Sequence, residues 1–287
     1  MPAFTSLPGF RDFYPEDLAV RARIMGAWRE SARRYGFEEY DGPPLEPLEL
    51  YIEKSGEEIV RQLYNFVDKG GRAVSLRPEM TPTLARMVGA RAGGLRKPVR
   101  WFSMPQLFRY ERTQRGRLRE HFQWNVDIIG EESVAADAEV LAVALDALRL
   151  LGLTEEDVVA RVSDRRLLER LLLNAGVPPT QLGTTYAVID KLGREREAVI
   201  RERLGTEAGL APASVDAVFA IFAHGSFEEL AAAYGTVEGV APELDRLAAY
   251  LGLLNDMGFG GFVTFDPTIV RGLAYYTGIV FEIFDRK

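Results

Sequence analysis

The fold is decided by one stretch of the sequence, FRYERTQRGRLREHFQWNVD at residues 108–127, in which an arginine-rich loop separates two strand-like runs. Side chains at alternate positions of a strand lie on the same face. The second run therefore predicts an apolar core face made by Phe122, Trp124, Val126 and Ile128. The opposite face is polar at every position and carries His121, Gln123, Asn125 and Asp127.

This polar face allows two interpretations. A polar strand face is commonly the solvated outer face of an antiparallel sheet. Solvated faces are usually rich in Lys, Glu and Thr, whereas amides with one carboxylate favour directional recognition. The preceding run places Arg109 and Glu111 at alternate positions. An arginine can bind a phosphate through two hydrogen bonds, and a glutamate can accept from an amine. The stretch thus indicates a site for a nucleotide and a small polar ligand.

The segments before this stretch have helix and hairpin patterns. Residues 16–35 have the periodicity of an amphipathic helix, and Gly36 stands where a left-handed C-cap is common. Residues 64–76 are typical of a hairpin that turns at 69–71. A helix is predicted from Thr81 to Ala92, with Thr81 as its N-cap. Further predicted elements are a strand that leads into a turn at 36–47, single strands at 99–111 and 121–130, and a helix at 133–151.

The pattern changes after about residue 158. Residues 164–257 are predicted to form a helical insertion, and strand patterns return at 258–287. Strands that resume after a long helical segment indicate one core with an insertion. We therefore predict an α+β fold with an antiparallel sheet flanked by helices, divided into a core at 1–163, an insertion at 164–257 and a return to the core at 258–287.

Composition excludes several classes of function. The 287 residues include no cysteine and two histidines, so disulfides, cysteine metal sites and histidine-rich metal sites are not expected. The net charge of −7 argues against a protein that coats nucleic acid. The N-terminal stretch has no signal-peptide pattern, and no apolar run reaches the length that crosses a bilayer, so we expect a cytoplasmic protein. The sequence contains no GxxxxGK[ST], GxGxxG, GxSxG or HExxH motif.

Several motifs together resemble those of class II aminoacyl-tRNA synthetases, and the histidyl-tRNA synthetase family is the most similar. FRYE, the arginine-rich loop and HFQWNVD resemble motif 2 of that class. The resemblance covers about Gly9 to Phe284. The other matching stretches are PGFRDFYPED at 8–17, YGFEEYDGPPLE at 35–46 with Pro43 as the motif 1 proline, LRPEMT at 76–81 and VRGLAYYTGIVFE at 270–282.

The resemblance implies an ATP site. Arg109 matches the arginine that holds the α-phosphate, and Glu111 matches the contact to the adenine amino group. His121 stands where an aromatic ring stacks on adenine, although the family usually has Phe-His where this chain has His-Phe. The loop that covers ATP and meets the 3′ end of tRNA would contain Arg112, Arg115, Arg117 and Arg119, and Arg119 is assigned to ATP.

The resemblance also implies a histidine site. Glu79 and Thr81 match residues at the α-amino group of the substrate. Gln123 and Asp127 match residues that face the substrate, with Asp127 as the partner of an imidazole N–H. Tyr275 and Tyr276 match the tyrosine pair of the pocket. Arg271 matches a catalytic arginine that approaches the histidine carboxylate and the α-phosphate, so Arg109 and Arg271 are the implied catalytic residues.

The implied reaction joins histidine to tRNA(His) through histidyl-adenylate, with ATP and Mg²⁺, in a homodimer without membrane contact. No residue is assigned to the metal. The carboxylate of histidine attacks the α-phosphate in line, and the enzyme contributes positioning and charge neutralisation. If Arg271 and Tyr276 reach one pocket, the strand that carries them must bend, and Gly272 is the predicted position of the bend.

Two departures from the family pattern keep an alternative open, although the presence of Glu79, Arg109, Gln123 and Arg271 favours the synthetase. Ala274 stands in place of the usual aspartate, and the chain ends at Lys287, before the expected motif 3 and anticodon-binding domain. We therefore expect a portion of a longer protein. The alternative is the regulatory subunit of ATP phosphoribosyltransferase, which shares the fold and senses histidine without charging tRNA. A prolyl- or threonyl-type synthetase is disfavoured by RGLAYYTG.

Overall fold

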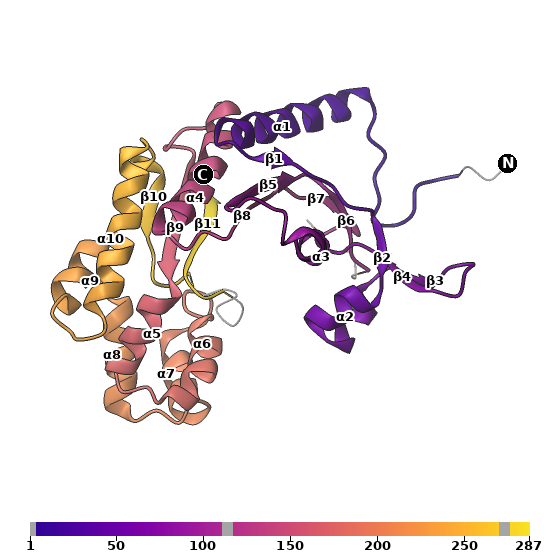
Figure 1. Cartoon of the computed structure of the whole chain (residues 1–287). Coiled ribbons are helices and arrows are strands. Elements are labelled where there is room, and N and C mark those ends of the chain that lie inside the picture. Colours follow the sequence, from indigo (N-terminus) through magenta and orange to yellow (C-terminus); the bar gives the residue numbers. More distant parts are fainter. Residues whose placement is uncertain (1–3, 111–116, 270–275) are drawn as a thin grey trace. The chain divides into compact units, whose positions relative to one another are not determined.

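The computed structural model describes residues 4–110, 117–269 and 276–287, apart from the side chains of Ser55, Glu57 and Glu58 (Figure 1). The chain forms two compact units, Met1–Glu132 and Ser133–Lys287. Each unit combines helices with strands, so the predicted α+β class is confirmed. Among the helices of the described ranges, none has both the length and the apolar character that a membrane span requires.

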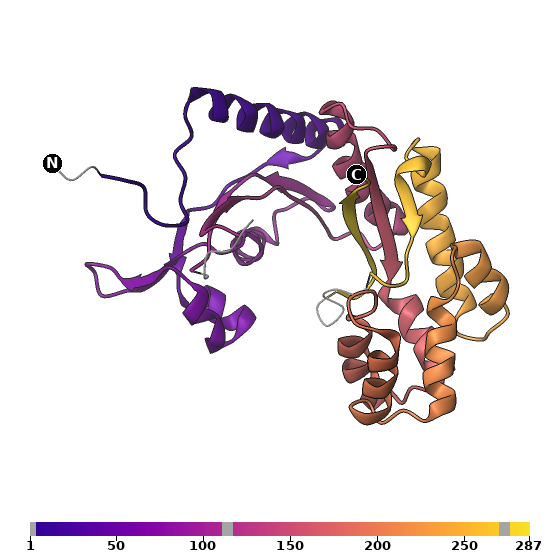
Figure 2. The same cartoon turned by 180° about the vertical axis from the view of Figure 1, so that it is seen from behind.

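The N-terminal unit begins with a helix and continues with short strands. Its elements are α1 (Pro15–Arg34), β1 (Glu38–Glu39), β2 (Leu45–Pro47), α2 (Glu49–Ser55), η1 (Glu57–Gln62), β3 (Asn65–Val67), β4 (Ala73–Leu76), α3 (Thr81–Arg91), β5 (Val99–Ser103), β6 (Gln106–Phe108), β7 (Glu120–Phe122) and β8 (Asn125–Ile129). Sheets form in the orders β1-β5-β8, β2-β4-β3 and β6-β7. Figures 1 and 2 show α1 alongside β1 and β5.

The two strands predicted at 99–111 and 121–130 are each split in two, which corrects the sequence-based prediction. β5 pairs with β8 and β6 pairs with β7, both antiparallel. Pro105 lies in the first break and has no N–H to donate to a sheet. Its carbonyl instead accepts a hydrogen bond from the backbone N–H of Gln123 in the second break, at 3.2 Å. The hairpin is therefore real, but it consists of two separate ladders.

One face of these strands packs against α1 and the segment before it. The ring of Trp124 stacks on Trp28 at a centroid distance of 5.7 Å. The ring of Phe122 meets Phe13 edge to face at 5.8 Å. On β5, Phe102 is fully buried. These contacts confirm the prediction of an apolar core face that includes Phe122 and Trp124.

The start of α3 differs from the prediction. Thr81 is the first residue of the helix, and Met80 precedes it as the N-cap, without a side-chain hydrogen bond. The predicted N-cap role of Thr81 is therefore wrong. Two other turns agree with their predictions: Gly36, after α1, has φ +75°, and Gly71, in the hairpin turn between β3 and β4, has φ +80°.

The C-terminal unit is built on a strand surrounded by helices. Its elements are α4 (Val134–Leu150), β9 (Val158–Asp164), α5 (Arg165–Asn174), η2 (Pro179–Gln181), α6 (Leu182–Ile189), α7 (Glu197–Thr206), α8 (Pro212–Phe222), α9 (Phe227–Tyr234), α10 (Ala241–Asp256), η3 (Gly260–Phe262), β10 (Val263–Phe265) and β11 (Ile279–Asp285). β9 is the central strand, parallel to β10 and antiparallel to β11. The predicted boundary at 163/164 falls inside β9, one residue before its end at Asp164. The predicted three-part division stays a prediction.

A buried aspartate joins β9 to two helices of this unit. Asp164 is 1% exposed, and its Oδ1 caps α5 by accepting from the backbone N–H groups of Arg166 and Leu167 at 2.7 and 3.2 Å. Its Oδ2 accepts from the guanidinium of Arg246 on α10. Burial raises the pKa of Asp164, and the Arg246 charge opposes that shift. The ion pair and the cap together give both oxygens of this buried carboxylate a hydrogen-bond partner.

Candidate active site

A group of polar side chains lies on the face of β5 and β8 opposite α1. In the register of the ladder, Trp101 lies opposite Asp127, and Ser103 lies opposite Asn125. Tyr40 follows β1 directly, and its backbone N–H donates to the carbonyl of Phe102 at 2.9 Å, so its side chain lies beside that of Ser103. We call the four residues Tyr40, Ser103, Asn125 and Asp127 the polar face.

Each residue of the polar face has a buried polar atom without a hydrogen-bond partner in the described structure. These atoms are Tyr40 OH, Ser103 Oγ, Asn125 Oδ1 and Asp127 Oδ2. A buried polar atom without a partner is costly, and native proteins keep few of them. The hydroxyls of Tyr40 and Ser103 lie close enough to interact with each other. The oxygens of Asn125 and Asp127 are therefore the stronger indication of a position prepared for a polar ligand.

Burial changes the acid–base behaviour of this face. It raises the pKa of Asp127 to about 6, because the charged carboxylate loses its hydration. It also raises the pKa of Tyr40 to about 12, so the phenol stays protonated. The Tyr40 ring lies 5.4 Å from the ring of Trp101. At neutral pH the face thus offers one carboxylate acceptor and one hydroxyl donor beside aromatic walls.

Arg109 lies where three segments of the N-terminal unit meet. Its backbone N–H donates to the carbonyl of Arg119 at 2.9 Å, and its side-chain Nε donates to the carbonyl of Pro78 at 3.2 Å. The second bond places Arg109 next to the segment that carries Glu79. The Arg109 side chain is otherwise exposed and can present its guanidinium to an anion.

The N-terminal segment holds Arg119 in place. The backbone N–H of Arg119 donates to the carbonyl of Gly9 at 3.0 Å, and its guanidinium lies 4.6 Å from the centre of the Tyr110 ring. Gly9 has φ +89°, and a Cβ at that position would lie 2.8 Å from Cγ of Arg119. Only glycine therefore fits both the backbone conformation and the contact.

The segment 76–81 divides into a buried and an open part. Arg77 is 4% exposed; its Nη1 donates to Oδ1 of Asp41 at 2.6 Å, and its Nε donates to the carbonyl of Gln106 at 3.1 Å. The following Glu79 is partly exposed and forms an ion pair with Lys54 of α2. Thr81 is exposed at the start of α3.

Sequence reasoning missed several residues that shape this site. Arg77 links three segments distant in sequence, and Glu46 accepts from Thr83 Oγ1 at 3.1 Å and from Arg86 at 2.6 Å while only 4% exposed. A charged residue within a buried strand pattern is a signal for such a pair, because an unpaired buried charge is very costly. Tyr40 and Ser103 gave no local signal.

The remaining predicted site residues fall into two groups. Gln123 is exposed in the break between β7 and β8, and His121 lies opposite the buried Leu107 in the β6–β7 ladder. Tyr276, 51% exposed, belongs to the C-terminal unit. Outside the described residues lie Glu111, Arg112, Arg115, Arg271 and Tyr275, and with them the predicted bend at Gly272.

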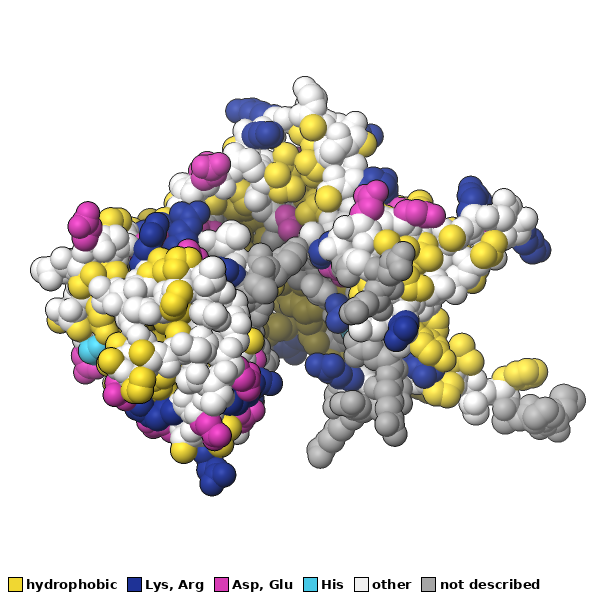
Figure 3. Space-filling view, turned by 90° about the horizontal axis from the view of Figure 1, so that it is seen from below, with side chains coloured by type: hydrophobic (Ala, Val, Ile, Leu, Met, Phe, Trp, Pro, Cys, Tyr) yellow, Lys and Arg dark blue, Asp and Glu magenta, His cyan; other side chains and the backbone are white. Residues whose placement is uncertain are grey.

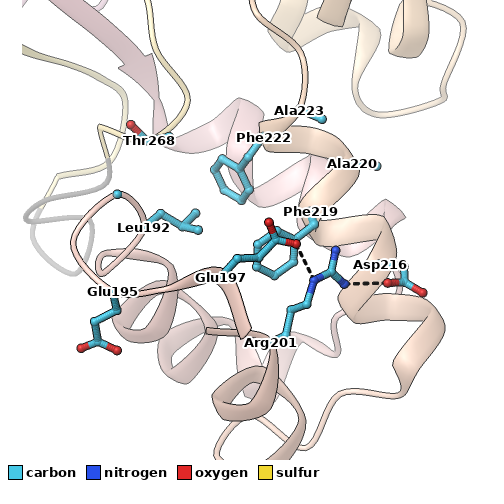
Figure 4. Close-up of a pocket in the computed structure, with 11 residues that line it drawn as sticks. Leu192, Glu195, Glu197, Arg201, Asp216, Phe219, Ala220, Phe222, Ala223 and Thr268 are labelled. Carbon is cyan, nitrogen blue, oxygen red and sulfur yellow. Dashed lines mark hydrogen bonds and ion pairs between the residues drawn. The ribbon is translucent and has the colours of Figure 1, made fainter. Parts of the chain in front are cut away.

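A pocket of about 620 Å³ lies among α7, α8 and the segments near them in the C-terminal unit (Figure 4). Arg201 lines it and donates to Glu197 at 2.7 Å and to Asp216 at 2.6 Å, with its guanidinium 4.1 Å from the centre of the Phe219 ring. Its charge is thus already matched by two carboxylates, and the pocket does not present a cation to an anionic ligand.

No metal cluster is evident in the described part of the chain. No group of three or more His, Cys, Asp or Glu side chains there is arranged to hold a metal ion. In the view of Figure 3, the Lys and Arg side chains that are described are interspersed with Asp and Glu side chains. The described residues therefore assign no ligand to Mg²⁺.

Comparison with known proteins gives a consistent result. A family model described as histidyl-tRNA synthetase matches residues 9–287. The histidine–tRNA ligase of Opitutus terrae is 44% identical and is matched over 100% of this chain and 66% of its own length. The chloroplastic/mitochondrial enzyme of Arabidopsis thaliana is 41% identical, with 97% of this chain and 57% of its own length matched. The chain thus spans about three fifths to two thirds of these curated relatives.

Solved structures support the fold. The histidyl-tRNA synthetase of Nostoc sp. PCC 7120 superposes with a TM-score of 0.85 at 22% identity, covering 99% of this chain and 65% of that chain. A second structure, from Bacillus halodurans, also superposes with a TM-score of 0.85, at 23% identity, and covers 99% of this chain and 73% of that chain. It is described as an ATP phosphoribosyltransferase regulatory subunit/histidyl-tRNA synthetase. At these identities the likeness shows the fold alone.

Proposed function

Because the chain belongs to the histidyl-tRNA synthetase family, we propose that it activates histidine with ATP and that the histidyl group passes from the adenylate to tRNA(His). The observation that carries this proposal is the polar face, where buried oxygens of Asn125 and Asp127 have no hydrogen-bond partner among the described residues. A small polar ligand bound there would satisfy buried groups that the described residues leave without partners.

Histidine suits the polar face chemically. Its imidazole offers an N–H to the Asp127 carboxylate and a second ring nitrogen that can accept from a hydroxyl such as that of Tyr40. Glu79 can hold the α-ammonium group. We further assign Thr81, Gln123, Tyr275 and Tyr276 to the surroundings of histidine, and Arg271 to its carboxylate, from the family resemblance.

ATP would lie beside Arg109, whose guanidinium would neutralise the α-phosphate. His121, Arg119 and Glu111 are assigned to the nucleotide, and Mg²⁺ would come with the ATP phosphates as part of the substrate. The histidine carboxylate attacks the α-phosphorus, a new P–O bond forms, and pyrophosphate leaves with the electrons of the broken bond. Arg109 and Arg271 would lower the cost of the charge that develops at phosphorus.

The partners are also proposals. Arg112, Arg115 and Arg117 would meet the 3′ end of tRNA(His). Homodimer formation is supported by apolar side chains that α1 and the residue before it expose, since Tyr14 is 67%, Val20 62% and Leu18 42% exposed. A cytoplasmic location accords with the cysteine-free composition.

Histidine-dependent exchange of pyrophosphate into ATP tests the proposal. It should be run with this chain and with the longer protein that contains it, together with Arg109→Ala and Arg271→Ala variants and Lys69→Ala as a surface control. We expect exchange in the longer protein, at least a hundredfold loss in each arginine variant and no change in the control. Histidine binding without any exchange would instead favour the regulatory subunit of ATP phosphoribosyltransferase.

A further inference from the structure

Helix α2 directs one lysine at the predicted amine site. The ammonium of Lys54 forms an ion pair with Oε2 of Glu79, and both side chains are 26% exposed. Two features fix the helix that carries Lys54. Tyr51 anchors α2 with 1% exposure, and the helix ends one residue after Lys54, where Gly56 has φ +75°. The lysine is thus held near the carboxylate by its helix.

The contact has the chemistry of ligand binding. A lysine side chain ends in a primary ammonium group with three donors, and so does the α-amino end of an amino acid. The pairing with Lys54 therefore demonstrates that the Glu79 carboxylate is accessible to a primary ammonium group. The ammonium of Lys54 and the α-ammonium of an amino acid would therefore compete for the same carboxylate.

The surroundings of Glu79 place this ammonium near the reacting group. The carbonyl of Pro78, the residue before Glu79, accepts from Nε of Arg109 at 3.2 Å. An ammonium at Glu79 and a phosphate at Arg109 would therefore be neighbours. An amino acid that is being activated has its ammonium only two bonds from the carboxyl carbon, so the two positions suit an amino acid and the phosphate that its carboxylate attacks.

We propose that Lys54 is an internal competitor for the amine site: its ammonium occupies the Glu79 carboxylate and must give way when the ammonium of the amino acid binds. This inference rests on the proposed function, because it takes Glu79 as the group that binds the α-amino end. Lys54 keeps the carboxylate neutralised and lowers the affinity for the amino acid, through competition for Glu79 and through repulsion between like charges.

Calorimetric titration of this chain tests the inference. The proteins are the wild type, Lys54→Met and Lys54→Gln, which remove the charge, and Lys54→Arg, which keeps it. The ligands are histidine and imidazole propionate, which lacks the amine. We expect both neutral variants to bind histidine about three- to fivefold more tightly, since partly exposed ion pairs contribute little more than this. Lys54→Arg should stay near the wild type, and imidazole propionate should bind the neutral variants and the wild type equally.

Each other result has a definite meaning. Equal histidine affinity in all proteins overturns the competition, and weaker binding in the neutral variants shows instead that Lys54 positions Glu79. A matched change for both ligands would mean a general change of the site and would also reject the inference. The control is Lys69→Met on the exposed hairpin turn, which should change neither affinity. If histidine binds none of the proteins, the proposed function fails, and the inference fails with it.

Discussion

Two aspartates, one in each unit, have buried carboxylate oxygens but different surroundings. Asp164 at the end of β9 has a partner for each carboxylate oxygen: two backbone N–H groups at Oδ1 and Arg246 at Oδ2. Asp127 on β8 has an Oδ2 without a partner among the described residues. Burial raises the pKa of both. The difference indicates that Asp164 serves the fold, whereas Asp127 is held in a costly state that a ligand can relieve.

Removal of the partner of Asp164 should have the largest effect. Arg246→Met leaves a carboxylate of 1% exposure without its cation, and we expect a loss of about 3–5 kcal/mol in the free energy of unfolding. The loss should shrink at acid pH, because the unpaired carboxyl then takes a proton. Urea denaturation at pH 7.5 and pH 4 measures both. An unchanged free energy at pH 7.5 would remove the contrast with Asp127.

Substitution of Asp127 should stabilise the fold, whereas substitution of Arg246 should destabilise it. The pKa of Asp127 rises from 3.8 to about 6 on folding, so the ionised carboxylate destabilises the fold above pH 6, and this cost disappears as the pH falls towards 4. Asp127→Asn should therefore raise the free energy of unfolding by about 1–3 kcal/mol at pH 7.5 and hardly at all at pH 4. The same denaturation series measures it.

The Asp127→Asn variant should also lose function. Histidine affinity of the wild type should fall as the pH drops through about 6, because the carboxylate becomes protonated. The variant should bind histidine at least tenfold more weakly at pH 7.5 and lack the part of the pH dependence that Asp127 contributes. A variant that is less stable at pH 7.5, or one that binds as well as the wild type, would contradict the assignment of Asp127.

Two tyrosines with buried hydroxyl oxygens allow a comparison in which smaller effects are expected. The hydroxyl oxygens of Tyr40, beside Ser103 in the polar face, and of Tyr250 on α10 are both buried. Tyr40→Phe and Tyr250→Phe should each change the free energy of unfolding by no more than about 1 kcal/mol. Only Tyr40→Phe should weaken histidine binding, by about three- to tenfold, in calorimetric titration. Equal behaviour of the two variants in that titration would place Tyr40 outside the ligand site.

The smallest effect is expected at Arg201. Its two ion pairs with Glu197 and Asp216 lie at the surface, where solvent screens them. Arg201→Met should leave the thermal midpoint and the rate of pyrophosphate exchange unchanged. A clear loss of exchange, measured against the Lys69→Ala control, would give the pocket of Figure 4 a role that its matched charges do not indicate.

The sequence predicts the local structure of this chain better than the pairing of its strands. Helix α1, the glycine turns and the apolar face of Phe122 and Trp124 follow from periodicity and backbone preference. The breaks at Pro105 and Gln123 were missed because side-chain alternation continues while ladder hydrogen bonds do not. The start of α3 was displaced by one residue, because Met80 occupies the N-cap without a side-chain bond.

The candidate site could be predicted only where it is local. Alternation identified the face that carries Asp127, and the family resemblance supplied the roles of Glu79 and Arg109. Tyr40 and Lys54 could not be found in this way. Tyr40 reaches the polar face because β1 pairs in parallel with β5, about sixty residues later, and Lys54 reaches Glu79 from a separate helix. Such partners depend on tertiary structure.

The buried Arg77 has a consequence for how the N-terminal unit opens. One side chain binds Asp41, the carbonyl of Gly42 and the carbonyl of Gln106. Its backbone also joins Pro44 and Phe108. Segments far apart in sequence therefore share one anchor and cannot fray separately. In native-state hydrogen exchange, the amides of Arg77 and Phe108 should exchange through one cooperative opening, with a common free energy.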